Sequence, residues 1–240
     1  MALPGWVRAR EDADVELLTA AVAAATLFLL YLATHRRGWV LALGAGWSVL
    51  QAAIALTGFY TDTTSLPPRL LLAVGPAAIA VAGLFFTARG RAFADDASLS
   101  HLTFLHVVRL PVELVLLMLF AGGLIPQIMT LEGRNYDVLT GITAPVAAYV
   151  GVVKGRLSTP VLVAWNVAGL FLLATIVFYG VFSVPGPLQR YGLEQPNVAI
   201  ARFPYVWIAS TVIPIALFCH LAALRQLLRR QGPITTSAES

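Results

Sequence analysis

Residues 103–125 read TFLHVVRLPVELVLLMLFAGGLI, and this stretch decides the fold class. A helix needs about 20 mostly apolar residues to cross the hydrocarbon core of a bilayer, and this run has that length. Apart from His106, Arg109 and Glu113, nearly all of its residues are apolar. The stretch therefore predicts a membrane-spanning helix that carries a few ionisable groups.

Similar apolar runs flank this one on both sides. They are 15–34, 39–59, 69–88, 138–153, 160–184 and 203–224. We therefore expect an all-α, multi-pass transmembrane bundle of seven spans, forming one domain over residues 1–230, with a disordered tail at 231–240. The run 138–153 is short and contains Pro145, so a tilted, broken or re-entrant element is the alternative there.

The composition excludes a soluble domain. The 240 residues are 58% hydrophobic and 12% charged, and their mean hydropathy is +0.79. A soluble globular protein has about 25% charged residues. The net charge of +4 does not indicate a nucleic-acid partner, because the arginines are scattered over short loops and form no basic stripe. We expect membrane lipids around the bundle instead.

The Lys and Arg residues of the short loops set the predicted orientation, because cytoplasmic loops carry an excess of them. With the N-terminus outside, the cytoplasmic set is Arg36, Arg37, Arg89, Arg91, Lys154, Arg156, Arg225, Arg229 and Arg230. The outer set is Arg8, Arg10, Arg69, Arg134, Arg190 and Arg202. The larger cytoplasmic set favours an N-terminus outside and a C-terminus in the cytoplasm.

Four polar residues form a stripe along the fourth predicted span. They are Thr103, His106, Arg109 and Glu113. Spacings of three, three and four place them on one face of an α-helix. Because lipid penalises such groups, we expect the stripe to face the interior of the bundle.

Two interpretations of this stripe remain open. In the structural one, Arg109 and Glu113 form an ion pair within the helix that fixes its packing. In the functional one, Glu113 binds a ligand or carries a proton, Arg109 tunes that carboxylate or binds an anionic group, and His106 relays protons toward the cytoplasm. Pro111 frees the carbonyl of Val107, which Arg109, water or a ligand can satisfy.

Polar residues of other runs can face the same interior. Gln51 in the second span and Asn166 in the sixth are further candidates for the ligand- or proton-binding site, with Ser210 and Thr211 in the seventh. Each alone is typical of a hydrogen bond between helices. Together with the stripe they favour a polar cavity.

The four histidines all fall toward the predicted cytoplasmic side. They are His35, His101, His106 and His220. His106 and His220 are possible haem or metal ligands from two helices, but no metal-binding motif surrounds them. We therefore expect no cofactor and no metal, with haem or a metal at these two residues as the alternative. Cys219, the single cysteine, is expected to be a small buried apolar residue.

Two predicted outer loops are rich in polar residues. The loop after the fourth span contains Glu132, Arg134, Asn135 and Asp137, which we expect at the outer surface. The longest loop covers residues 185–202. Mixed charge with Gly and Pro turns indicates ordered loops that cap the bundle or bind a protein partner.

Absent motifs narrow the function. The only lysine is Lys154, outside the last span, so a retinal Schiff base of the rhodopsin type is excluded. The chain has no nucleotide-binding or hydrolase motif. A stripe without a second catalytic cluster favours binding or transport of a small molecule or proton over enzymatic activity. The alternatives are a membrane-embedded redox or metal-dependent enzyme acting on a lipid-soluble substrate, and a structural subunit that docks a partner.

Overall fold

A computed structural model describes residues 5–229, with side chains from residue 13 onward, and this part of the chain contains helices and no strands. The α-helices are α1 (Gly5–Ala33), α2 (Gly38–Leu56), α3 (Leu71–Leu84), α4 (Ala88–Asp96), α5 (Leu99–Phe104), α6 (Arg109–Ala121), α7 (Val138–Val146), α8 (Thr159–Phe182) and α9 (Ile213–Arg229). Short 3₁₀ segments are η1 (Phe59–Thr61), η2 (Leu105–Val108) and η3 (Gln127–Met129), and π-helical segments are η4 (Ala147–Val153) and η5 (Ile208–Val212). The predicted tail at 231–240, Arg230 and the side chains of Arg8 and Arg10 lie outside the described residues.

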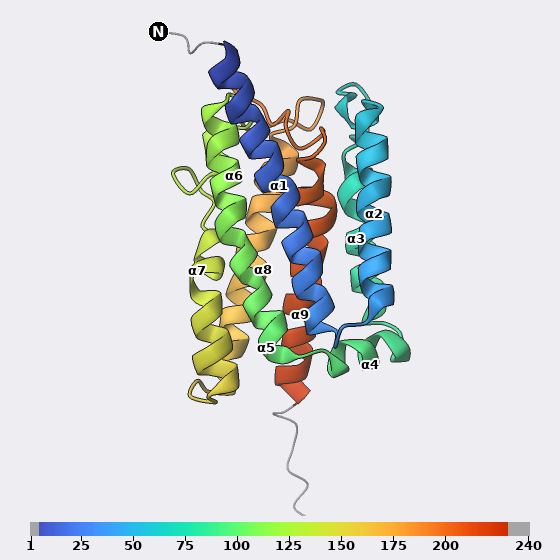
Figure 1. Cartoon of the computed structure of the whole chain (residues 1–240), viewed down its shortest axis with the longest axis vertical. Coiled ribbons are helices and arrows are strands. Elements are labelled where there is room, and N and C mark those ends of the chain that lie inside the picture. Colours follow the sequence, from blue (N-terminus) through green and yellow to red (C-terminus); the bar gives the residue numbers. More distant parts are fainter. Residues whose placement is uncertain (1–4, 230–240) are drawn as a thin grey trace, which may run out of the picture.

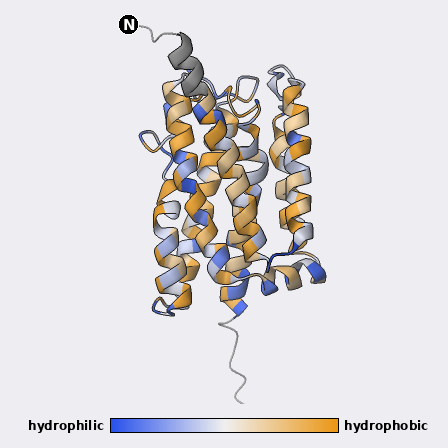
Figure 2. Ribbon diagram, viewed as in Figure 1, coloured by the Kyte–Doolittle hydropathy of each residue, from blue (hydrophilic) through white to orange (hydrophobic). Residues whose placement is uncertain are grey.

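The all-α prediction is confirmed for the described residues. Five of their helices are long and apolar enough to cross a membrane: Ala13–Ala33, Gly38–Leu56, Leu99–Ala121, Thr159–Phe182 and Ile208–Arg229. A sixth follows if α3 and α4, which meet at 90°, count as one bent span. The apolar helix Val138–Val153 is shorter than these candidate spans. Hydrophobic residues run along the length of these helices, and hydrophilic ones gather toward their ends (Figure 2).

The third predicted span, 69–88, is wrong at its end. Helix α3 stops at Leu84, and the chain turns into α4, which lies across one end of the bundle (Figure 1). The Thr87 hydroxyl caps the new helix by accepting from Gly90 N at 3.0 Å. A Cβ on Gly90 would stand 2.1 Å from Leu84 O, so only glycine permits this tight turn.

The fourth predicted span, 103–125, begins too late and is not one continuous α-helix. It starts at Leu99, tightens into a 3₁₀ turn at 105–108 and resumes as α6 at Arg109. Pro111 then lies in the first turn of α6. Proline has no N–H to donate to the turn before it, and the chain accommodates this by changing from the 3₁₀ turn to α6 just ahead of Pro111.

The bundle has two unequal parts (Figure 1). Helices α1 and α5 to α9 pack together, and α2 and α3 stand to one side. Near their middle, α2 and η5 are joined by three hydrogen bonds: Ser48 Oγ with Thr211 Oγ1 at 2.9 Å, Trp47 Nε1 to Ser210 O at 2.8 Å, and Trp207 Nε1 to Ser48 O at 2.8 Å. Pro214 has no N–H for Ser210 O, which leaves that carbonyl free to accept from the indole.

The loop between α6 and α7 folds back along the bundle. Helix α7 therefore begins well below the end at which α6 stops (Figure 1). Met129, Thr130, Asn135 and Asp137 of this loop are buried. The predicted span 138–153 is thus a short helix preceded by an inward-folded loop, and this loop supplies half of the polar site.

Candidate functional site

Arg109 is buried at the start of α6, and its carboxylate partner is Asp137. Its Nη1 donates to Asp137 Oδ1, and the guanidinium is 3% exposed. The ion pair between Arg109 and Glu113 within the helix, on which the structural interpretation of the stripe rested, is not formed. The inward-folded loop brings Asp137 to the first residue of α6 from 28 positions away.

Glu113 holds the same loop by a separate contact. Its carboxylate accepts from Leu131 N at 2.6 Å and from Asn135 Nδ2 at 2.8 Å. The predicted outer-surface position of Asn135 and Asp137 is therefore wrong, because the two are only 4% and 8% exposed.

The other two residues of that predicted surface set, Glu132 and Arg134, are exposed. The difference has a physical reason: a buried carboxylate and a buried guanidinium on α6 need partners, and the loop provides them.

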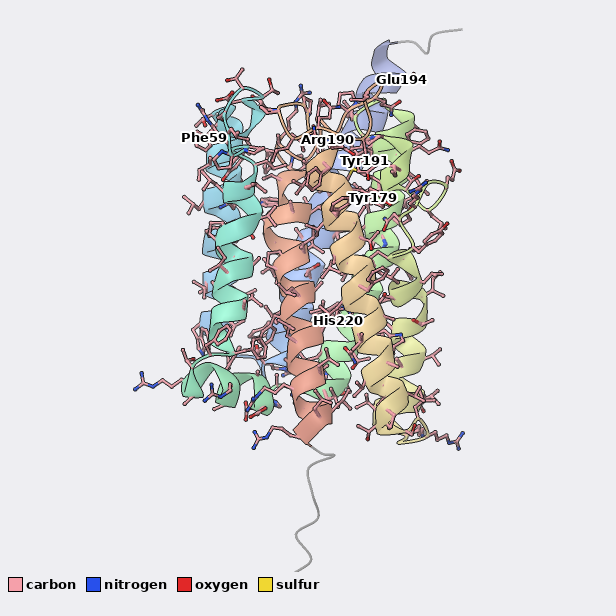
Figure 3. The ribbon with its side chains drawn as sticks, turned by 180° about the vertical axis from the view of Figure 1, so that it is seen from behind. Phe59, Tyr179, Arg190, Tyr191, Glu194 and His220 are labelled. Carbon is pink, nitrogen blue, oxygen red and sulfur yellow. The ribbon has the colours of Figure 1, made fainter. Side chains whose placement is uncertain are left out.

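His220 on α9 continues the chain of contacts, and it lies in the half of the bundle nearer α4 (Figure 3). Its Nε2 lies 3.2 Å from Arg109 Nη2, and its Nδ1 lies 2.9 Å from Asn166 Oδ1 on α8. A guanidinium has only donors, so Nε2 must accept and Nδ1 must carry the hydrogen. Asn166 is oriented to match, because its Nδ2 donates to Leu162 O at 2.9 Å. These contacts fix His220 as the neutral Nδ1–H tautomer.

His106 stacks on His220. The ring centroids are 3.8 Å apart with an interplanar angle of 17°, and Trp165 meets His106 edge-on at 5.7 Å. His106 is fully buried, yet neither of its ring nitrogens has a hydrogen-bond partner. A buried polar atom without a partner marks a place for a water, an ion, a proton or a ligand.

The stacked geometry does not fit the haem alternative. Two axial ligands must approach an iron from opposite faces of a porphyrin. The rings of His106 and His220 lie against each other, with no space between them. Across residues 13–229, no group of three or more His, Cys, Asp or Glu side chains is arranged to hold a metal ion.

Not every predicted site residue joins this network. Thr103 is buried but donates to Leu99 O of its own helix at 2.8 Å. Gln51 is buried and accepts from Tyr60 Oη at 2.6 Å. Asp137 and His220 are the members that the sequence did not assign to the ligand site: Asp137 was expected at the outer surface, and His220 was considered only as a haem or metal ligand.

A family described as a domain of unknown function, DUF8737, matches residues 66–228, which is 163 of the 240 residues. The chain belongs to this family. No curated protein and no solved structure matches it. The DUF8737 segment extends from just before α3 almost to the end of α9 and contains Arg109, Asp137, Asn166, His106 and His220. The buried network is thus a feature of the DUF8737 segment, whereas α1 and α2 precede it.

All the residues that line a small cavity beside the network belong to the DUF8737 segment. The cavity measures about 70 Å³, and Arg109, Asn135 and Asp137 line it together with apolar side chains of α6, α8 and α9. A cavity needs roughly 10–15 Å³ to hold one water, so this cavity has room for a few waters. It adjoins the Arg109–Asp137 pair on the side where the inward-folded loop lies.

Proposed function

We propose that the protein crosses the membrane seven times, with its N-terminus outside and its C-terminus in the cytoplasm. Support comes from the charges at the two ends of the bundle. Among the described side chains, eight Lys and Arg residues lie at the α4 end: Arg36, Arg37, Arg89, Arg91, Lys154, Arg156, Arg225 and Arg229. Three lie at the opposite end, Arg69, Arg190 and Arg202, and Arg134 lies in the inward-folded loop. By the positive-inside rule, this difference favours an α4 end in the cytoplasm.

The function of this bundle is to bind a proton at the buried network and to couple its binding to the inward-folded loop. The observation that carries this proposal is the stacked pair of His106 and His220, of which one ring has no partner and the other has a fixed tautomer. Intramembrane ionisable groups usually mark a site or a proton path. Histidine is the side chain whose charge changes near neutral pH.

Proton uptake must rearrange this site. A proton on His220 Nε2 would turn the acceptor of Arg109 into a donor, so two cations would face each other. A proton on His106 would place a cation against the neutral His220 ring, with Arg109 as the next positive charge. Either state weakens the contact between Arg109 and His220. Asp137 is the carboxylate that pairs with Arg109 on its other nitrogen, Nη1.

The size of the cavity favours a proton over an organic ligand. Sites for small organic molecules occupy about 300–1,000 Å³. The cavity of about 70 Å³ beside Arg109 holds only a few waters. Waters next to the Arg109–Asp137 pair are suited to delivering protons, so the network itself favours a proton as its ligand.

Trp165 supplies a direct test, because its ring contacts both His106 and His220 at centroid distances of 5.7 and 5.8 Å. We would titrate the tryptophan fluorescence of the purified protein from neutral pH down to the acid at which the fold is lost, because burial and the neighbouring guanidinium of Arg109 both oppose the protonation of these two rings. Wild-type protein should show a transition that disappears in Trp165→Phe and in His106→Gln. His101→Gln is the matched control, because His101 is exposed and contacts Ser98 instead.

Proteoliposomes with an internal pH dye then separate proton transport from proton sensing. Transport would collapse an imposed pH gradient in wild-type vesicles and not in His106→Gln vesicles. A Trp165 signal that stays flat across the titration, or that persists unchanged without His106, contradicts the proposal.

A further inference from the structure

A second and much larger cavity lies on the other side of α9. It is a groove of about 920 Å³ between α2, α3 and α9, and α4 forms its floor. The groove shares no lining residue with the buried network. Its volume falls within the range of about 300–1,000 Å³ that is typical of ligand sites.

The groove exists because α2 is hydrogen-bonded to the α9 side of the bundle at one level only, and a space remains between α2, α3 and α9 on the α4 side of that level. The three hydrogen bonds between α2 and η5 close its outer end. Below them, α2 and α3 present small residues to the space, among them Gly44, Ala77 and Ala80. The turn at Gly90 places α4 across the bottom.

The walls of the groove are apolar, and one side faces outward. Trp39 and Leu43 line it and are 57% and 67% exposed. Within a bilayer this side is open to lipid chains. An empty apolar groove of this size would forfeit dispersion contacts along its walls, so an acyl chain is the natural filling.

The charged residues of the groove all lie at its α4 end. Arg37 is occupied, because its Nη2 donates to Asp96 Oδ2 at 2.8 Å and its guanidinium lies over the Phe93 ring. Arg89 is exposed and has no hydrogen bond or ion pair with any other described side chain. One unneutralised positive charge therefore stands where apolar walls meet the membrane surface.

We propose that this groove binds one anionic phospholipid of the surrounding bilayer. Its acyl chain lies between α2, α3 and α9, and its phosphate lies against Arg89. The charge at the mouth selects the negative headgroup, because a basic residue at the membrane surface attracts anionic lipid. The site is independent of the proposed proton site, since neither needs residues of the other.

The test is lipid retention measured by native mass spectrometry. The full-length protein would be released from nanodiscs made of phosphatidylglycerol or of phosphatidylcholine with the same chains. Wild-type protein should keep one phosphatidylglycerol molecule and much less phosphatidylcholine. Arg89→Gln should reduce retention of the anionic lipid roughly fivefold, which corresponds to the loss of one basic residue at the surface.

Two matched controls separate the groove from general surface effects. Arg91→Gln removes a charge from the same helix outside the groove and should leave retention unchanged. Ala80→Phe should fill the groove and abolish retention, whereas Ile79→Phe, at a neighbouring position that is 73% exposed, should not. If Ala80→Phe fails to fold, the exposed Arg89→Gln variant still decides the question.

Equal retention of the two lipids would overturn the proposal, as would equal behaviour of Arg89→Gln and Arg91→Gln. A retained organic molecule that is not a phospholipid, or a second copy of the chain instead of lipid, would overturn it as well. His106→Gln should retain the lipid like the wild type. That result keeps the failure of one proposal distinct from the failure of the other.

Discussion

Replacing Gly169 by alanine is the most direct perturbation of the buried histidine pair. A Cβ on Gly169 would lie 2.4 Å from His220 Cε1 and 2.7 Å from His220 Nε2. Carbon atoms in contact are separated by about 3.5–4.0 Å, so the His220 ring must move away from α8 by roughly 1 Å. Its hydrogen bond to Asn166, which is also on α8, would then stretch well beyond the present 2.9 Å and be lost.

The expected cost follows from these contacts. Overpacking a filled interior costs about 1–3 kcal/mol. Loss of a hydrogen bond between neutral partners adds about 0.5–1.5 kcal/mol. The greater helix propensity of alanine offsets about 1 kcal/mol. Gly169→Ala should therefore lower the free energy of unfolding by roughly 0.5–3.5 kcal/mol.

The assay is unfolding in mixed micelles followed by circular dichroism. Gly180→Ala on the same helix is the control, because its Cβ would meet only the end of Met129 at 3.5 Å. That variant should be as stable as the wild type or slightly more stable. A double-mutant cycle sharpens the test: in a His220→Ala background only Thr140 Cγ2, at 3.2 Å, stays close to the new Cβ, so Gly169→Ala should cost much less than in the wild type. If Gly169→Ala is as stable as Gly180→Ala, the geometry assigned to His220 is refuted.

Three other predictions concern the loop, the tautomer and the α4 end. Glu113→Gln leaves one of the two loop donors facing an N–H, so we expect the free energy of unfolding to fall by about 1.5–3 kcal/mol and amide exchange in loop 126–137 to become faster. The exposed Glu132→Gln variant is the control and should behave like the wild type. Nitrogen-15 spectra of histidine-labelled protein at neutral pH should show His220 as the neutral Nδ1–H tautomer, and an Nε2–H signal would contradict the network. Burial raises the pKa of Asp95, but the two α9 arginines that bind it lower this pKa by a larger amount. The pKa of Asp95 therefore lies below its usual value of 3.8. A carboxylate whose pKa is lower in the folded protein stabilises the fold at pH values above its unfolded pKa, and this contribution is lost as the pH falls through the folded pKa. Wild-type protein should therefore lose stability in acid by an amount that Asp95→Asn does not lose.

The apolar pattern predicted where helices occur better than how they end. Every predicted run coincides with a helix in the structure, because a bilayer-length apolar segment has few other ways to satisfy its backbone. The errors lie where a local turn overrides apolarity. The third run stays apolar as far as residue 88. Helix α3 nevertheless ends at Leu84, because the Thr87 hydroxyl caps a new helix and Gly90 permits the tight turn into it.

The site was predictable on one helix only. Periodicity placed four stripe residues on a common face, and all four are buried. Their partners could not be read from the sequence, because they come from distant elements: Asp137 is 28 residues from Arg109, and His220 is 111 residues from it. The ion pair between Arg109 and Glu113, one of the two interpretations of the stripe, is not formed for this reason. Spacing along a helix identifies which groups need partners, and only tertiary packing supplies them.

The failure of that pair changes how the site can work. If Arg109 were bound to Glu113, both charges would be confined to α6 and would stabilise that helix alone. Instead each holds the inward-folded loop, Glu113 at Leu131 and Asn135 and Arg109 at Asp137. Arg109 presents Nη1 to the loop and Nη2 to His220 from one planar group. A movement of the His220 ring therefore cannot leave the loop contact unchanged, because the same rigid guanidinium makes both bonds.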